Sequence, residues 1–365
     1  TPARRTYSPD RNSGFMMAIP FDLFLPALRP PLLTANIPGT GGAIKAQPED
    51  FEVEEIPAYL PSGQGEFLYL WVEKRGLGAA YFQRQVAQRL GIGPGDIGAA
   101  GLKDRHAVTR QWISVPAAVE DRLGALEGDG IRVLAVSRHG NKLRPGHLHG
   151  NRFRILIRGA TSPDLAPLRD RGMPNFYGPQ RFGVGGETLK TGLALLSGKR
   201  VGRLSPFLRK LALSAVQSAL FNLYLAERLQ DGLLHTVLAG DVMAKVPRGG
   251  MFVAQDVAAE QARLERREIV SAGPIFGFKT YAAADLARQR EEALLGRVGL
   301  GEHSFAPFKK LMPGTRRHNL VYLSDLETTI ETEGVRLAFT LPAGSYATVL
   351  LREVMKSEDA EKGEE

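Results

Sequence analysis

One short segment, residues 101–112, gathers side chains that could do acid–base or nucleophilic chemistry. It reads GLKDRHAVTRQW and holds Asp104 between Lys103 and Arg105. Neighbouring cations favour an ionised carboxylate, and an ionised aspartate can act as a nucleophile or a general base. The segment joins two strand-like pieces, so we expect a loop, where scaffolds commonly present reactive groups. From the residues alone, an aspartate that caps a turn is the competing interpretation.

Strand patterns surround this loop and indicate a sheet that positions it. Residues 66–73 form the clearest strand, because they are rich in aromatic and β-branched side chains. Residues 43–56 predict two short strands around a turn at 48–50. Strands and helices alternate irregularly, so we expect an α+β fold with a mixed or antiparallel sheet. Further strand-like segments lie at 98–101, 110–115, 131–137, 152–158 and 335–341.

Apolar residues at helical spacing predict helices, most of them in the second half of the chain. The longest covers 206–228, with Ser205 as the expected N-cap and Pro206 as the first helical residue. Because strand character returns near the end, the simplest architecture is a mainly helical domain inserted into a sheet domain. The other predicted helices lie at 80–90, 257–267, 282–295 and 347–356.

These patterns divide the chain into a leader, a sheet domain in two parts, an inserted domain and an acidic tail. The basic start of the chain lacks hydrophobic periodicity and predicts a flexible leader. Residues 15–33 are apolar, but charged residues and four prolines argue against a membrane-spanning helix. The expected ranges are 1–38 for the leader, 39–171 and 321–356 for the sheet domain, 172–320 for the inserted domain and 357–365 for the tail.

The composition favours an anionic partner and a reducing compartment. The 365 residues carry a formal charge of +8. Lys and Arg side chains that neutralise phosphates release condensed counterions, so nucleic acid is the first partner to consider. The chain has no cysteine, which excludes disulfides, thiolate nucleophiles and cysteine-based zinc sites. We therefore expect a cytoplasmic protein.

Six sequence segments resemble signatures of one family. Residues 101–112 resemble the TruD pattern in which Gly-x-Lys-Asp is followed by Ala-x-Thr-x-Gln. Residues 175–183, NFYGPQRFG, are similar to a second signature with its two aromatic residues exchanged. The six matches follow the family's order and together cover about residues 43–353. The remaining four lie at 45–51, 150–153, 215–222 and 341–348.

The resemblance implies a fold, a reaction and a partner. The implied fold is a pseudouridine synthase-like catalytic domain interrupted by an inserted, mainly helical α/β (TRUD) domain. The implied activity is an RNA modification, the isomerisation of uridine to pseudouridine at position 13 of tRNA, without a cofactor. We accordingly expect an isomerase that binds tRNA, holds no metal, contacts no membrane and is a monomer.

The resemblance also implies a set of site residues. The family's catalytic aspartate falls on Asp104, and its basic partner falls on Lys45, which would keep the carboxylate charged in a partly desolvated pocket. Enzymes that act on a base within RNA unstack it, and aromatic or apolar side chains typically hold the flipped base. For each aromatic candidate, a place in the core is the alternative. The predicted substrate-binding residues are Phe51, Asn151, Phe153 and Tyr346.

Basic clusters could bind the RNA backbone. Residues 138–154 are dense in Arg, Lys and His, and a smaller cluster lies at 316–318 in the predicted insert. Backbone contacts of this kind position an RNA without reading its sequence. A solvated charged face is the alternative for each cluster. The candidates for phosphate contacts are Arg138, Lys142, Arg144, Arg316 and Arg317.

Two other functions compete with this interpretation. One is an RNA-binding protein or RNA chaperone that has the fold without the chemistry. The other is a glycosidase that pairs Asp104 with Glu49 or Asp50. Retaining glycosidases place their two carboxyl groups about 5 Å apart. A structure with Lys45, rather than an acid, beside Asp104 would therefore exclude the glycosidase.

Overall fold

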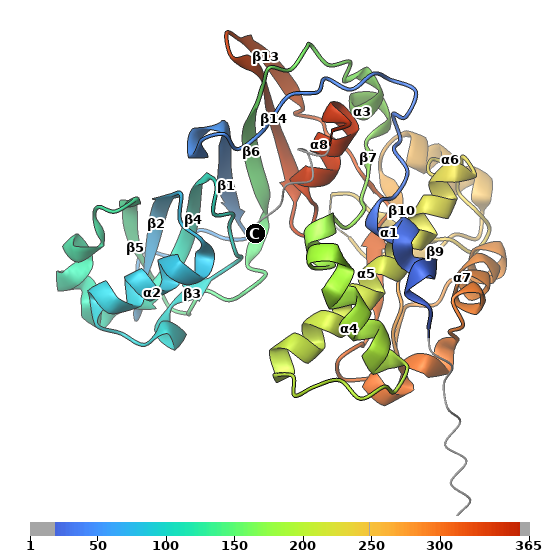
Figure 1. The fold of residues 1–365 in the computed structure, drawn as a ribbon, viewed down its shortest axis with the longest axis horizontal. Helices are drawn as coiled ribbons and strands as arrows, with labels where there is room; N and C mark the ends of the chain where they lie inside the picture. The colour runs from blue at the N-terminus through green and yellow to red at the C-terminus, as the bar shows by residue number, and fades with distance from the viewer. Residues whose placement is uncertain (1–18, 248, 358–365) are drawn as a thin grey trace, which may run out of the picture.

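The centre of the protein is an eight-stranded mixed sheet, seen here in a computed structural model that describes residues 19–247 and 249–357. Its strands are β1 (Phe51–Pro57), β2 (Phe67–Arg75), β3 (Gly98–Ala99), β4 (Val108–Pro116), β5 (Ile131–His139), β6 (Leu148–Arg158), β13 (Glu327–Glu331) and β14 (Gly334–Pro342). Their order is β13-β14-β6-β1-β4-β2-β5, with β3 beside β4 (Figure 1). Every pairing is antiparallel except that of β1 with β4. The expected α+β fold with a mixed sheet is confirmed.

One face of the sheet forms the interior of the protein. Cross-strand partners share a face, and the register links Lys74, Thr109, Val53, Phe153 and Phe339 into one row across five strands. All five residues are buried. Within this row the positions on β2 and β4 are polar, and those on β1, β6 and β14 are apolar.

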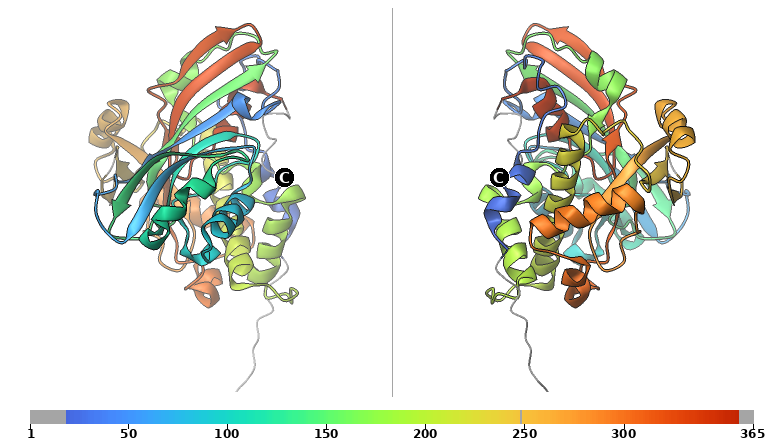
Figure 2. Two further views of the ribbon diagram at one scale, coloured as in Figure 1. Left: turned by 90° about the vertical axis from the view of Figure 1, so that its left-hand side faces the viewer. Right: turned by 90° about the vertical axis from the view of Figure 1, so that its right-hand side faces the viewer.

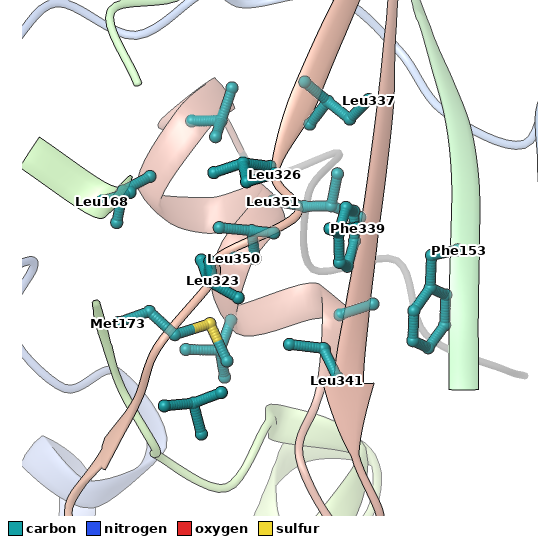
Figure 3. Packing of buried hydrophobic residues seen from close by; sticks show 14 of the residues in the cluster. Phe153, Leu168, Met173, Leu323, Leu326, Leu337, Phe339, Leu341, Leu350 and Leu351 are labelled. Atoms are coloured by element: carbon teal, nitrogen blue, oxygen red, sulfur yellow. The ribbon is translucent and has the colours of Figure 1, made fainter. Parts of the chain in front are cut away.

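Two helices cover this face of the sheet, one at each end of the row of strands. Helix α2 (Ala79–Leu90) packs on β2 and β4, and α8 (Ala347–Met355) packs on β14 through Leu350 and Leu351 (Figure 3). The left view of Figure 2 shows both helices on the same side of the twisted sheet. Strands β4, β1 and β6 lie between the two helices.

The insert follows β6 and carries a second sheet of its own. Strands β8 (Val242–Lys245), β9 (Met251–Val253), β10 (Ile269–Ile275) and β11 (Thr315–His318) pair in the order β11-β10-β8-β9. Strand β7 (Met173–Pro174), where the chain enters the insert, pairs with β12 (Leu320–Val321), where it leaves. The segment that enters the insert and the segment that leaves it are therefore hydrogen-bonded to each other. The helices of the insert are α4 (Glu187–Leu196), α5 (Pro206–Gln230), α6 (Val257–Glu265) and α7 (Asp285–Arg297).

Helix α5 connects the insert to the sheet. It begins as predicted, with the Ser205 hydroxyl accepting a hydrogen bond from the Leu208 amide at 3.2 Å and with Pro206 in the first turn. Phe221 and Leu225 of α5 belong to the same apolar cluster as the residues of β14 and α8. This core contains residues from both the predicted sheet domain and the predicted insert. The boundaries between the two domains stay predictions. Among the residues described, none of the helices has the length and apolar character needed to span a membrane.

The prediction of a flexible leader is wrong for residues 19–38. A 3₁₀ turn (Phe21–Phe24) leads into α1 (Leu25–Leu28), where Phe24 and Ala27 are fully buried in the core around α5. Thr34 then donates to the buried carboxylate of Glu353 at 2.6 Å. Prolines break the periodicity of this segment, so its apolar residues give no helical or strand signal, although Ile19, Phe24 and Ala27 are buried. The rest of the predicted leader, 1–18, and the tail residues 358–365 lie outside the described residues.

A buried carboxylate anchors the loop before β1. Asp50 accepts two hydrogen bonds from Arg158, at 2.8 and 2.7 Å, and a third from the amide of Gln47 at 3.1 Å. The other end of the loop is held by reciprocal backbone bonds between Ala43 and Arg158. Burial acts to raise the pKa of Asp50, but the hydrogen bonds from Arg158 and Gln47 outweigh it, so the pKa is lowered.

We expect Asp50→Asn to lower the free energy of unfolding by about 1–3 kcal/mol at neutral pH, because charge-assisted hydrogen bonds to a buried group are lost. A carboxyl whose pKa falls on folding stabilises the protein above its ordinary value, 3.8, and less at lower pH. The gap between wild type and variant in urea denaturation should therefore shrink as the pH falls below 3.8. A gap that widens on acidification would contradict this account.

Candidate active site

Lys45, Phe51 and Asp104 meet where β1 and β4 begin. The Lys45 Nζ atom lies 3.8 Å from Asp104 Oδ2 and 4.5 Å from the centroid of the Phe51 ring. The Lys45 side chain is 10% exposed and that of Asp104 is 32% exposed, so the carboxylate stays accessible while its cation is mostly covered. Lys45 has a φ of +59°, a left-handed conformation uncommon for residues other than glycine. The anchored loop holds it there.

Lys74 fixes the backbone of the loop that carries Asp104. It lies at the end of β2, is 1% exposed, and donates from Nζ to the carbonyl oxygens of Lys103 at 3.2 Å and Asp104 at 2.8 Å. It also donates to the carbonyl of Leu77. One buried ammonium thus gathers three backbone carbonyls, so it sets the position from which the Asp104 side chain projects.

Lys103 points away from Asp104 and forms a buried cluster with two other residues. Its Nζ atom lies 3.1 Å from Glu55 Oε2 and donates to Asn151 Oδ1 at 2.6 Å. Burial raises the pKa of the Glu55 carboxyl, and Lys103 acts in the opposite direction. An ammonium can only donate, so the contact fixes the oxygen of the Asn151 amide toward Lys103. The amide NH₂ is left to face elsewhere.

The two predicted aromatic contacts, Phe51 and Phe153, are packed against each other. Their ring centroids lie 6.2 Å apart in an edge-to-face arrangement, and Phe153 stacks on Phe339 at 5.2 Å (Figure 3). Phe51 is 2% exposed and Phe153 is 7% exposed. Both therefore have core contacts, as the alternative interpretation expected, and their contact with substrate stays a prediction.

Tyr346 lies just after β14, at the N-cap of α8. The pairing of Leu341 with Asn151 brings the end of β14 beside the site. The Tyr346 ring meets the edge of Tyr177 from the insert at a centroid distance of 5.8 Å. Burial raises the pKa of Tyr346, so its hydroxyl stays protonated at neutral pH.

The structure thus joins five of the six predicted residues. Lys45, Phe51 and Asp104 contact one another in a chain; Asn151 is reached through Lys103 and Phe153 through Phe51. Within the described part of the chain, no hydrogen bond, ion pair or ring contact links Tyr346 to these five. Tyr346 contacts the insert instead.

The predicted phosphate contacts have different surroundings. The Arg138 side chain is exposed and pairs with Glu120, while Lys142 donates to the carbonyl of Gly95. Lys142 and Arg144 line a pocket of about 450 Å³ that is also lined by Leu102 from the loop that carries Asp104. These two cations therefore lie close to the loop of Asp104.

The phosphate contact predicted for Arg316 is contradicted. Its side chain is 1% exposed and pairs with Glu291, with Nη2 donating to Oε2 at 3.0 Å. Successive residues of a strand point to opposite faces, so Arg316 of β11 enters the core of the insert and Arg317 does not. Charge clustering in sequence could not separate these two neighbours.

The glycosidase alternative is excluded by the partners of its acids. Glu49 forms an ion pair with Arg75, and Asp50 is held by Arg158. The charged group beside Asp104 is Lys45. The described residues contain no cluster of three or more His, Asp or Glu side chains suited to a metal ion.

Two residues of the site were missed from sequence, Glu55 and Lys74. Each continues the buried phase of its strand: Glu55 follows Phe51 and Val53 at spacing two, and Lys74 follows Val72. A charged residue in the buried phase of a strand is rarely buried unless it is paired. That alternation was the available signal.

Comparisons with known proteins identify the family of this chain. A family model described as tRNA pseudouridine synthase D (TruD) matches residues 30–201 and 199–354. This chain belongs to the TruD family. The TruD proteins of Anaeromyxobacter sp. (strain Fw109-5) and Thermus thermophilus, both named tRNA pseudouridine synthase D, are 47% and 45% identical to it. The alignments cover 90% and 92% of this chain and 96% and 95% of those proteins.

A solved structure shows the same fold. The crystal structure from Methanosarcina mazei that carries the TruD name matches with a TM-score of 0.74. The match covers 94% of this chain and 100% of that chain at 22% sequence identity. The sheet and its insert therefore form the TruD fold.

We expect Lys103→Met to destabilise the protein by about 3–5 kcal/mol, because it leaves the Glu55 carboxylate buried without its cation. Adding Glu55→Gln should recover part of this loss, since the orphaned charge is removed. Urea denaturation of the two single variants and the double variant measures the coupling. Arg75→Met, which opens the exposed pair with Glu49, is the matched control and should leave the unfolding midpoint nearly unchanged. A double variant less stable than Lys103→Met would contradict the account.

Proposed function

We propose that this protein converts uridine 13 of tRNA to pseudouridine, with Asp104 as the catalytic carboxylate. The observation that carries the proposal is the ion pair between Asp104 and Lys45, formed by two signature segments in a chain of the TruD family. The relatives' name supplies the reaction and the RNA class, and the family resemblance supplies the position. We assign catalysis to residues 39–171 and 321–356, and substrate grip to the insert, 172–320.

The reaction is balanced without a redox partner or cofactor. The N1–C1′ glycosidic bond breaks and the uracil turns within the site. A new bond then joins C5 of the base to C1′ of the ribose, the C5 proton leaves, and N1 takes up a proton. A carboxylate serves either route to this outcome, as a nucleophile on the base or as a base that removes a proton from the sugar.

Asp104 is suited to this role by its surroundings. Its side chain is partly exposed, so a flipped nucleotide can reach it, and Lys45 supplies a positive charge beside it. Lys74 holds the backbone on which it stands, which limits the movement of the carboxylate. Preorganised positioning of this kind removes entropy from the reacting step.

The base would be recognised by the residues along the same face. Lys103 orients the Asn151 amide, so its NH₂ can donate to a carbonyl of the uracil or to the ribose. Phe51 and Phe153 supply the apolar wall beside Asp104, and Tyr346 supplies an aromatic ring from the side of the insert.

The cysteine-free composition fits a cytoplasmic enzyme.

We expect Asp104→Asn to lower pseudouridine formation by at least about 100-fold, because the variant keeps the shape of the side chain and loses its basicity and nucleophilicity. The measurement is single-turnover formation of pseudouridine at position 13 in an unmodified tRNA transcript, detected by carbodiimide mapping. Asp129→Asn is the matched control, since Asp129 is an exposed carboxylate paired with Arg89 on the surface, and it should retain full activity.

Three outcomes distinguish the competing accounts. Activity retained by Asp104→Asn would refute the assignment of the carboxylate. Pseudouridine at another tRNA position would refute the target. Tight tRNA binding by the wild type, without pseudouridine at any position, would favour the RNA chaperone instead.

A further inference from the structure

The second signature segment, residues 175–183, gathers two arginines around one aromatic ring beside the candidate site. Arg317 of β11 lies with its guanidinium carbon 4.1 Å from the centroid of Tyr177. Arg181 lies 5.7 Å from the same ring. The ring edge also meets Tyr346, which belongs to the catalytic part of the chain. Two cations and two aromatic rings thus meet where the insert joins the sheet domain.

The backbone of Tyr177 is held by the buried side chain of Asn222. Asn222 on α5 accepts from the Tyr177 amide at 2.8 Å and donates to the Tyr177 carbonyl at 3.0 Å. It also donates to the carbonyl of Ala27 at 2.8 Å. One amide therefore ties three segments together, and the Tyr177 ring packs edge-to-face against Phe221 at a centroid distance of 5.7 Å.

The Arg317 guanidinium is fixed in the same way. Its Nε donates to the carbonyl of Asn175 at 2.9 Å and its Nη2 donates to Asn175 Oδ1 at 2.7 Å. A guanidinium has five N–H donors, so these two bonds leave further donors for other acceptors. Arg317 lines a pocket of about 310 Å³ together with Thr315, His318 and Ser345. Ser345 is the neighbour of Tyr346 in sequence.

Neither arginine has an acidic partner among the residues that the structure describes. Arg181 donates to the Ser218 hydroxyl, at 3.0 Å, and to that of Ser214, and Arg317 donates to Asn175 and interacts with the Tyr177 side chain. Burial lowers the pKa of Arg317, Tyr177 and Tyr346 act in the opposite direction, and the nearby charge of Arg181 adds to the lowering. Two half-buried cations without an anion are costly, and a bound anion would offset that cost. Arg158, Arg228 and Arg316, by contrast, each pair with a carboxylate.

We propose that Arg181 and Arg317 bind one phosphodiester of the tRNA strand, immediately next to the reacting uridine. The inference rests on the proposed activity on tRNA. A planar guanidinium matches a phosphate with two parallel hydrogen bonds, and the Tyr177 ring beside Arg317 presets that plane. Tyr346 contacts Tyr177 and follows β14, whose end pairs with β6 at Asn151, so one nucleotide could be held at both its base and its backbone.

The test compares tRNA binding by wild type, Arg317→Gln and Arg181→Gln as the salt concentration is varied. One neutralised phosphate contributes about 0.7–0.9 to the slope of log affinity against log salt, so each variant should lower the slope by up to that amount. Arg297→Gln is the matched control. It removes one exposed arginine of α7 that pairs with Glu227, and it should leave the slope unchanged.

A second arm locates the phosphate. Single uncharged methylphosphonates are placed at each phosphate flanking uridine 13 of the transcript. One position should weaken wild-type binding about threefold or more, and the same position should have little further effect in Arg317→Gln. If Arg317 only braces Asn175, its variant will melt at lower temperature with an unchanged salt slope, and every methylphosphonate will act equally on both proteins. That result would overturn the proposal.

Pseudouridine formation by the wild type on the same transcript separates this proposal from the function on which it rests. If the wild type forms pseudouridine and the salt slopes of Arg317→Gln and Arg181→Gln equal that of the wild type, only the phosphate site is refuted. Absence of product would refute the proposed function, while the salt slopes would still decide whether the two arginines bind a phosphate.

Discussion

The arrangement of the site depends on the parallel pairing of β1 with β4. In this pair Glu52 lies opposite Val108, so the two strands begin at the same edge and their preceding loops are neighbours. One loop carries Lys45 and the other carries Asp104. Antiparallel pairing would place the Asp104 loop at the far end of β1, roughly 20 Å away at about 3.3 Å per residue. The single parallel pair in an otherwise antiparallel sheet is thus what brings the cation to the carboxylate.

Buried charged side chains then fix the positions of the Asp104 loop and of the Asn151 amide, which strand pairing alone does not determine. Lys74 at the end of β2 donates to carbonyl oxygens of the Asp104 loop, and Lys103 within that loop contacts Glu55 and Asn151. Removing one partner of such a group costs far more than opening an exposed ion pair, because the remaining charge stays desolvated. The same reasoning makes Arg181 and Arg317 unusual, since within the described chain they carry the cost of burial without an anion.

Helices and strands with a regular pattern of apolar residues could be predicted from the sequence. Helix α5 begins at its Ser-Pro cap, α2 covers the predicted 80–90 with one further residue, and β2 lies where aromatic and β-branched residues cluster. Residues 19–38 were mistaken for a leader because prolines hide their burial. Arg316 was mistaken for a surface residue because strand alternation, and not local charge density, decides which side chain turns inward.

The site itself was predictable only through the family resemblance. Lys45, Asp104, Asn151 and Tyr346 come from four segments spread over most of the chain, and local patterns carry no information on which distant loops meet. Glu55 and Lys74 are different, since their strand phase alone marks them as buried charges. Their partners still required the three-dimensional register.

The most direct test of the central claim is a structure of the Asp104→Asn protein bound to an unmodified tRNA. The account predicts that uridine 13 is flipped out of the RNA, with its C1′ or C6 atom within about 3.5 Å of the residue 104 side chain and Lys45 on the opposite side of that side chain. A complex in which the flipped uridine lies away from Asp104, or in which the tRNA contacts the opposite face of the sheet, would contradict it.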